Sequence, residues 1–292
     1  MEQQAVNGIF SGSIYALFAV GYTLVFGVLD ILNLAHQAVF MVGGVVALEL
    51  MLGWHLAFWL ALLAGTAAAG LLGVVLERLA FRPLRRRPGT EFSALISSLA
   101  IATMFEAIVL QVYGPNLQRF PAGAFPASVY QLGDARVSLL QVVIVAVSAA
   151  LTLALYLLLQ HSRLGSAIRA VAENRLAARV LGIDVDRVIL VTVVVSSALG
   201  GTAGVLYALV FNGADPAVGH AVELKGLAVI ILGGMGSIPG AVLGGYLLGL
   251  TEVATVAGLG SPFRDAAAFL VLFVILMVRP RGLLGRKAVR SA

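Results

Sequence analysis

Long apolar stretches alternate along this chain with short segments in which polar residues gather. A helix needs about 20 mostly apolar residues to cross a bilayer. Two stretches, 36–52 and 222–236, are short and rich in glycine, so each could be a half-helix that does not cross fully. The pattern therefore predicts about eight to ten crossings. The nine predicted membrane segments are 6–29, 36–52, 56–80, 93–113, 139–160, 187–211, 222–236, 240–258 and 264–279.

Composition agrees with this pattern and excludes a soluble enzyme. Hydrophobic residues make up 60% of the chain and charged residues 11%, whereas soluble domains have about 25% charged residues. Small residues recur four positions apart, as at Gly8 and Gly12 or Gly245 and Gly249, a spacing that lets membrane helices pack closely. No linker separates two cores. The expected fold is an all-α polytopic bundle with one transmembrane domain over residues 1–292.

Basic residues are distributed unevenly between the two ends of the predicted spans. If the spans alternate, one side receives 78–92, 161–187 and the tail from Arg279, which together hold 15 of the 19 lysines and arginines. Cytoplasmic loops carry such an excess, so we expect the N-terminus outside and the C-terminus in the cytoplasm. Placed beside membrane spans, these charges indicate orientation, and no nucleic-acid partner is predicted.

The longer basic segment, 161–187, combines apolar and basic positions at helical spacing. Leu164, Ile168, Val171 and Leu181 alternate with arginines, and Gly182 is placed to end a helix. Such a helix could lie on the membrane surface, with its arginines on anionic headgroups. Acidic and amide residues dilute the positive charge, which favours docking to a cytoplasmic partner. The diluting residues are Glu173, Asn174, Asp184 and Asp186.

Four polar residues interrupt the apolar sequence at the junction of the first two predicted spans: Asp30, Asn33, His36 and Gln37. The spacing of three between the first members predicts that they share one helical face. Polar groups inside a membrane usually face a protein interior or a water-filled cavity. The alternative is that they lie at the level of the cytoplasmic headgroups.

Residues 165–183 resemble the coupling loop of the branched-chain amino-acid ABC permeases of the LivH/LivM type. Residues 7–36 resemble that family's first segment, and residues 233–240 its late glycine turn. The likeness covers almost the whole chain. Importers generally have Glu-Ala-Ala, three residues and then Gly in this loop. Here Leu176 replaces the acid, while Ala177, Ala178 and Gly182 keep the spacing.

The resemblance implies a short helix that sits in a groove of an ATP-binding subunit. The residues expected in this coupling contact are Arg169, Glu173, Asn174, Arg175, Ala177, Ala178 and Gly182. It also implies a break near the transport pathway, where the family carries Asn-x-Ala-His and usually Gly; Gln37 stands in the place of that glycine. The expected pathway residues are Tyr22, Asn33, His36, Gln37, Phe40, Phe105 and Glu106.

By the same resemblance, the chain is expected to serve an importer of branched-chain or other hydrophobic amino acids in a bacterial inner membrane, with relatives for urea and amides. Expected partners are a second homologous permease, two ATP-binding subunits, a periplasmic substrate-binding protein and membrane lipid. ATP and Mg would bind in the partner subunits, because no Gly-x-x-x-x-Gly-Lys-Ser/Thr motif is present. No catalytic residue is assigned, and the four histidines have no metal-ligand spacing.

Two carboxylates, Glu106 and Glu252, lie well inside predicted spans. A charge at the bilayer centre costs at least about 3 kcal/mol, so each should face a partner or a cavity. The rival function is a secondary transporter or channel that couples an ion gradient through one of them. Asn212, Asp215, His220 and Glu223 are expected in a solvated loop, or in a docking surface for the delivery protein.

Overall fold

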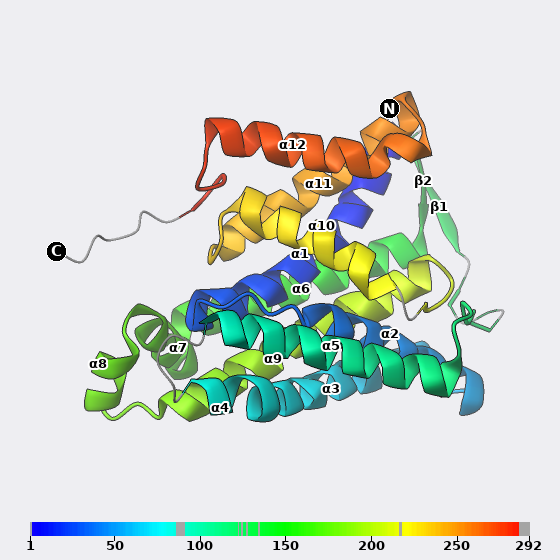
Figure 1. Cartoon of the computed structure of the whole chain (residues 1–292). Coiled ribbons are helices and arrows are strands. Elements are labelled where there is room, and N and C mark those ends of the chain that lie inside the picture. The colour runs from blue at the N-terminus through cyan, green and yellow to red at the C-terminus, as the bar shows by residue number, and fades with distance from the viewer. Residues whose placement is uncertain are drawn as a thin grey trace.

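A computed structural model describes residues 2–85, 91–121, 123, 125–126, 128–133, 135–215 and 218–285. Within these residues the fold is an all-α bundle, shown in Figure 1, and eight helical segments are long and apolar enough to cross a membrane. The eight segments are Glu2–Leu29, His36–Gly53, Phe58–Leu84, Phe92–Tyr113, Leu139–His161, Val185–Val210, Ile238–Gly258 and Ser261–Val278.

The helices follow the predicted order. α1 (Glu2–Leu29), α2 (His36–Gly53) and α3 (Phe58–Leu76) come first, and α3 continues through a π-helical turn (Glu77–Phe81) into α4 (Arg82–Leu84). α5 (Glu91–Tyr113), α6 (Leu139–His161), α7 (Arg163–Glu173), α8 (Arg175–Val180) and α9 (Val185–Val210) follow. The chain continues with α10 (Val218–Gly233), α11 (Ile238–Gly258), a 3-10 turn (Ser261–Phe263) and α12 (Arg264–Val278). The expected weak span 222–236 is α10, which has 16 residues.

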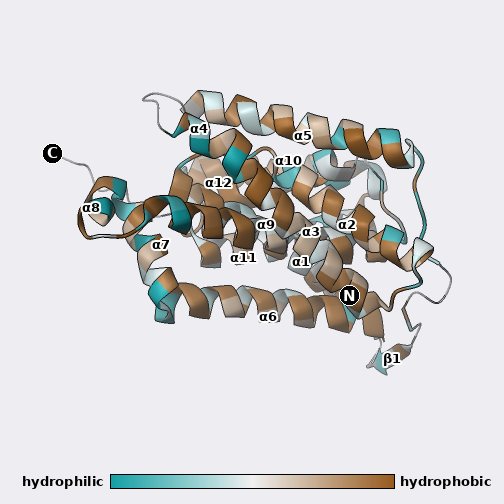
Figure 2. Cartoon of the chain, turned by 90° about the horizontal axis from the view of Figure 1, so that it is seen from below, coloured by the Kyte–Doolittle hydropathy of each residue, from teal (hydrophilic) through white to brown (hydrophobic). Residues whose placement is uncertain are grey.

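The two ends of the bundle differ in polarity. α7, α8 and the C-terminal end of α12 lie at one end, and the N-terminus lies at the other (Figure 1). Hydropathy colouring shows apolar long helices, with hydrophilic residues on α4, α7 and α8 (Figure 2). The predicted clustering of basic segments at one end is present for the described residues. Arg86, Arg87, Arg286, Lys287 and Arg290, which belong to that prediction, lie outside them.

Glycine allows the closest helix contacts, as the four-residue spacing predicts. A Cβ on Gly12 of α1 would lie 2.8 Å from the Cα of Tyr246 in α11, and one on Gly245 would lie 2.5 Å from the amide N of Ala16. A Cβ on Gly204 of α9 would overlap the carbonyl of Phe40 in α2. Because lipid gives helices no hydrophobic drive to associate, this close packing holds the bundle together.

The connections contain turns that the sequence predicts and one hairpin that it does not. Gly234 and Gly236 have φ angles of 101° and 80°, and the Ser237 side chain caps α11 by accepting a hydrogen bond from the Gly240 amide. This confirms the predicted hairpin between α10 and α11. The long loop before α6 forms an antiparallel hairpin of β1 (Val129–Leu132) and β2 (Ala135–Ser138).

Candidate functional site

The polar segment after α1 turns back into the bundle. Asp30 ends the helix with a φ of 58°, and residues 30–35 run beside α1 before α2 begins at His36. Asn33 stabilises this turn, since its Oδ1 accepts a hydrogen bond from the Ala35 amide at 3.1 Å. The expectation that Asp30, Asn33 and His36 share one helical face is therefore wrong, because the backbone leaves the helix at Asp30.

His36 lies inside the bundle and not at the level of the headgroups. Its side chain is buried, and Nε2 lies 3.2 Å from the Phe18 carbonyl in α1. A Cβ on Gly200 of α9 would lie 2.7 Å from the imidazole ring. Of the four polar residues at this junction, Asn33, His36 and Gln37 are buried, whereas Asp30 is exposed at the end of α1.

Aromatic rings surround the break. Phe18 lies 4.7 Å and Tyr22 5.3 Å from the His36 ring, centroid to centroid. Phe40 lies 5.4 Å from Phe18 and 5.4 Å from Tyr207 of α9. The structure thus brings together Tyr22, His36 and Phe40, three of the predicted pathway residues.

Several buried polar atoms near the break have no hydrogen-bond partner among the described residues. They are Tyr22 Oη, Asn33 Nδ2, His36 Nδ1, Gln37 Oε1 and Glu223 Oε1. Buried polar groups in proteins are nearly always paired, and the exceptions mark sites that need a physical explanation. We name this group of five side chains the polar core.

Glu223 corrects the expectation of a solvated loop. It lies in the first turns of α10 and is 6% exposed. Gly219, Glu223 and Gly226 share one face of α10; a Cβ on Gly219 would lie 3.1 Å from the Gln37 carbonyl, and one on Gly226 would overlap the Phe18 ring. This face of α10 therefore covers the break.

The other two predicted pathway residues lie on α5, beside the polar core. Glu106 pairs with His220 of α10, with 2.9 Å between Oε2 and Nε2. A cavity of about 10 Å³ separates this pair from Gln37. Phe105 is half-buried against the core. It stands apart from the ring contacts described around His36.

Glu252 of α11 has the partners that its depth requires. Its side chain is fully buried; Oε1 lies 2.7 Å from Lys225 Nζ, and Oε2 lies 2.6 Å from Arg264 Nη2. The Tyr15 hydroxyl donates a third contact at 2.9 Å. Lys225 Nζ also pairs with Asp265 Oδ1 at 2.9 Å. This network, the ionic cluster, joins α1, α10, α11 and α12.

At the basic end, the segment 161–187 forms two helices and not the single amphipathic helix that the periodicity predicts. Asn174 separates them with an extended backbone, and its side chain caps α8 by accepting a hydrogen bond from the Ala177 amide. Gly182 ends α8 with a φ of 83°, as expected. The sequence signal for the break was present, because asparagine is a preferred N-cap residue.

The two helices expose different faces. α7 buries Ile168 and Val171 against the bundle. α8 buries Ala178 but leaves Leu176, Val180 and Leu181 largely exposed, at 73%, 82% and 77%. Among the predicted coupling residues, Arg169, Glu173, Asn174, Ala177 and Gly182 are also exposed. The apolar face predicted to run from Leu164 to Leu181 therefore turns outward after Asn174.

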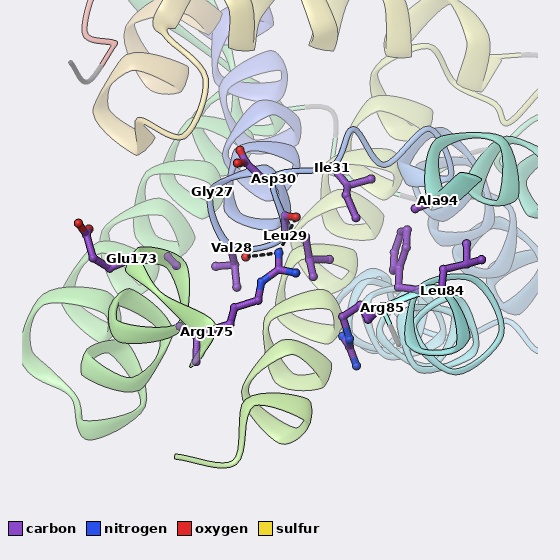
Figure 3. A pocket seen from close by; sticks show the side chains of 13 residues that line it. Gly27, Val28, Leu29, Asp30, Ile31, Leu84, Arg85, Ala94, Glu173 and Arg175 are labelled. Atoms are coloured by element: carbon purple, nitrogen blue, oxygen red, sulfur yellow. Dashed lines mark hydrogen bonds between the residues drawn. The ribbon is translucent and has the colours of Figure 1, made fainter. Parts of the chain in front are cut away.

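Arg175 points inward, as Figure 3 shows. Its Nη2 donates hydrogen bonds to the carbonyls of Val28 at 3.1 Å and Leu29 at 2.6 Å, at the C-terminal end of α1. A cation at this position also complements the negative end of the helix dipole. The contact borders a cavity of about 400 Å³ between α1, α4, α5 and α7. Arg175 therefore ties α8 to the segment that leads into the polar core.

Comparison with known proteins now identifies the chain. Residues 4–279 match the sequence profile of the family described as "Branched-chain amino acid transport system / permease component". The chain belongs to this family. It is 35% identical to the high-affinity branched-chain amino acid transport system permease protein LivH of Escherichia coli (strain K12), over 99% of this chain and 97% of that protein.

Two further relatives extend the likeness over nearly all of the permease. The high-affinity branched-chain amino acid transport system permease protein BraD of Pseudomonas aeruginosa is 35% identical, with 99% of this chain and 97% of BraD covered. The probable branched-chain amino acid transport permease protein LivH of Methanocaldococcus jannaschii is 28% identical, with 97% and 93% covered. The permease is a multi-pass membrane transport protein and not an enzyme.

Proposed function

We propose that this permease is a LivH-like subunit of an ABC importer that moves branched-chain or other hydrophobic amino acids across the inner membrane by alternating access. ATP and Mg bind in two partner ATPase subunits. A second homologous permease completes the pore, and a periplasmic binding protein delivers the cargo. Family membership over residues 4–279 supports this assignment.

α8 is the observation that carries the proposal. It is a short helix with exposed leucine and valine side chains, at the end of the bundle where the described arginines gather. Apolar side chains of this size on a six-residue helix offer a partner subunit an anchor that buries them. Arg175 then connects the docked helix to α1 and, through residues 30–35, to His36.

In this mechanism the α8 end faces the cytoplasm and the N-terminus faces outside. Movement of the ATPase subunits displaces α8, and Arg175 transmits the displacement to the end of α1. The pathway runs past Tyr22, Asn33, His36, Gln37 and Phe40, with Phe105 and Glu106 on its α5 side.

The rival function, ion-driven transport through Glu106 or Glu252, has less support. Glu106 is paired with His220, and Glu252 is paired with both Lys225 and Arg264. Glu252, held by two cations, and Glu106, in contact with an imidazole, are both poorly placed to exchange an ion during each cycle.

Two variants test docking and transmission separately. Leu176→Asp places a charge on the exposed face of α8, and we expect the ATPase subunits to be lost on copurification while membrane insertion is unchanged. Arg175→Gln should keep the ATPase subunits bound but reduce the stimulation of ATP hydrolysis by loaded binding protein. Arg163→Glu, an exposed change at the start of α7, is the control. Unchanged copurification with Leu176→Asp would contradict the coupling assignment.

Orientation has its own test. The chain has no cysteine, so the single change Arg179→Cys on α8 can be labelled selectively in the permease expressed without its ATPase subunits. We expect a membrane-impermeant thiol reagent to react with it in inside-out vesicles and not in intact cells. Labelling in intact cells would show that α8 faces outside and would contradict the proposed orientation.

A further inference from the structure

One buried carboxylate, that of Glu223, bears on which cargo the permease binds. Glu223 lies on the face of α10 that carries Gly219 and Gly226; Gly226 lies against the Phe18 ring of α1, and Gly219 lies against Gln37 of α2. Glu223 is 6% exposed, and no described cation forms an ion pair with it. Tyr22, seven residues from the end of α1 or about 10 Å along the helix, lies within the bundle. Glu223 and Tyr22 are therefore both buried within the permease.

Burial without a cation beside it disfavours the ionised form of the Glu223 carboxyl. A cation that enters the site can take up the role of the missing ion-pair partner and stabilise the ionised form. Neighbouring polar atoms can also bind such a cation. Tyr22 Oη can donate or accept a hydrogen bond, and Gln37 Oε1 can accept one from a positively charged group. Phe18 and Phe40 supply an apolar, aromatic wall on the same side of the break.

We propose that Glu223, with the Tyr22 hydroxyl and Gln37 Oε1, binds the ammonium group of the cargo during its passage, and that the rings of Phe18 and Phe40 contact its apolar side chain. This inference rests on the proposed function and sharpens it. A site that requires an ammonium group accepts leucine, isoleucine and valine, and discriminates against urea and simple amides, which carry no positive charge.

Glu106 and the ionic cluster do not offer the same chemistry. Glu106 already has His220 at 2.9 Å. Glu252 already has two cations and a tyrosine. Among the described buried carboxylates of the bundle, Glu223 is the one that forms no ion pair within the protein, so it can pair with a cationic ligand.

The structure has the polar core packed closed, since the neighbouring cavity of about 10 Å³ holds at most one water. Cargo therefore enters only after α10 separates from α1 and α2. The small contact residues on α10, Gly219 and Gly226, let the helix lie directly on Gln37 and Phe18 in this closed arrangement.

The test uses the complete importer in detergent and in liposomes. Thermal unfolding of the assembled complex without binding protein is measured with leucine, with isoamylamine, which lacks the carboxylate, and with 4-methylpentanoate, which lacks the ammonium. We expect leucine and isoamylamine to raise the midpoint and 4-methylpentanoate to leave it unchanged. Glu223→Gln should weaken the response to both amines by about 30-fold or more in concentration.

Glu49→Gln, an exposed carboxylate on α2, is the matched control and should behave as the parent protein. Equal responses of Glu223→Gln and the parent would overturn the inference, as would stabilisation by 4-methylpentanoate alone. Tyr22→Phe gives a second reading and should weaken the amine response less than Glu223→Gln does. ATP-driven leucine uptake by the parent importer tests the proposed function separately; its absence would contradict that function whatever the amines do.

Discussion

Glu252 and Glu223 are both carboxylates buried among apolar helices, yet their surroundings are opposite. Glu252 forms ion pairs with Lys225 and Arg264 and accepts a hydrogen bond from Tyr15, so the protein itself supplies cations to its carboxylate. Glu223 forms no ion pair with a described residue, and its Oε1 has no hydrogen-bond partner among the described residues. One site is complete without cargo, and the other is not.

The difference separates structural from functional polarity in a membrane bundle. Intramembrane charges are expensive and are commonly kept for function, but the ionic cluster joins four helices and needs no ligand. The polar core concentrates several atoms that have no partner among the described residues at the break between α1 and α2. Stability measurements on matched variants can break or sharpen this comparison.

The largest effect is expected for Glu252→Ala. It leaves Lys225 and Arg264 without their shared partner, and removing one member of a buried ion pair costs about 3–5 kcal/mol. We expect a lower yield of folded permease and a lower unfolding midpoint in detergent. A midpoint equal to that of the parent would mean that the ionic cluster does not stabilise the bundle.

Tyr15→Phe should have the next largest effect. The hydroxyl donates to the Glu252 carboxylate at 2.9 Å, and a hydrogen bond to a charged group contributes about 1.5–3 kcal/mol. The unfolding midpoint should fall while leucine uptake per folded complex is retained. Uptake lost without loss of stability would place Tyr15 on the transport pathway.

Tyr22→Phe is the matched change on the same helix, at the polar core instead of at the ionic cluster. Because the Tyr22 hydroxyl is buried without a partner, its removal should change the free energy of unfolding by less than about 0.5 kcal/mol. Leucine uptake should fall instead. A loss of stability as large as that of Tyr15→Phe would show that the Tyr22 hydroxyl is paired in the native permease.

Glu223→Gln should have the smallest effect on stability, and its sign is expected to be neutral or favourable, since it replaces a buried carboxyl that has no ion-pair partner with an uncharged amide. Chemical denaturation of the detergent-solubilised permease measures this. A destabilisation like that of Glu252→Ala would indicate a structural cation at Glu223. The proposed difference between the two carboxylates would then be wrong.

The sequence predicts the parts of this picture that depend on local pattern. The long apolar stretches predict the helices, and Gly182 predicts the end of α8. The break before His36 was expected only from the family resemblance, because the spacing of the polar residues there predicted a shared helical face. The Asn174 break was missed because the apolar spacing on either side of it continued across the cap. Side-chain capping overrode the periodicity there.

Glu223 could not be located from its own sequence context. It lies in the first turns of a short helix that follows a polar segment, a pattern that is typical of a solvated loop. Its burial depends on α10 lying across α1 and α2. The partners of Glu252 were equally hidden, since Lys225 and Arg264 come from two other helices. Burial and pairing of this kind are set by tertiary contacts that lie far apart in the chain.

The most direct measurement is a structure of the assembled importer trapped with leucine inside, using ATPase subunits that bind ATP but hydrolyse it slowly. The account predicts leucine in the polar core, with its ammonium nitrogen within hydrogen-bonding distance of the Glu223 carboxylate and the Tyr22 hydroxyl. Leucine bound instead between Glu252 and Arg264, with Glu223 remote from it, would contradict the account.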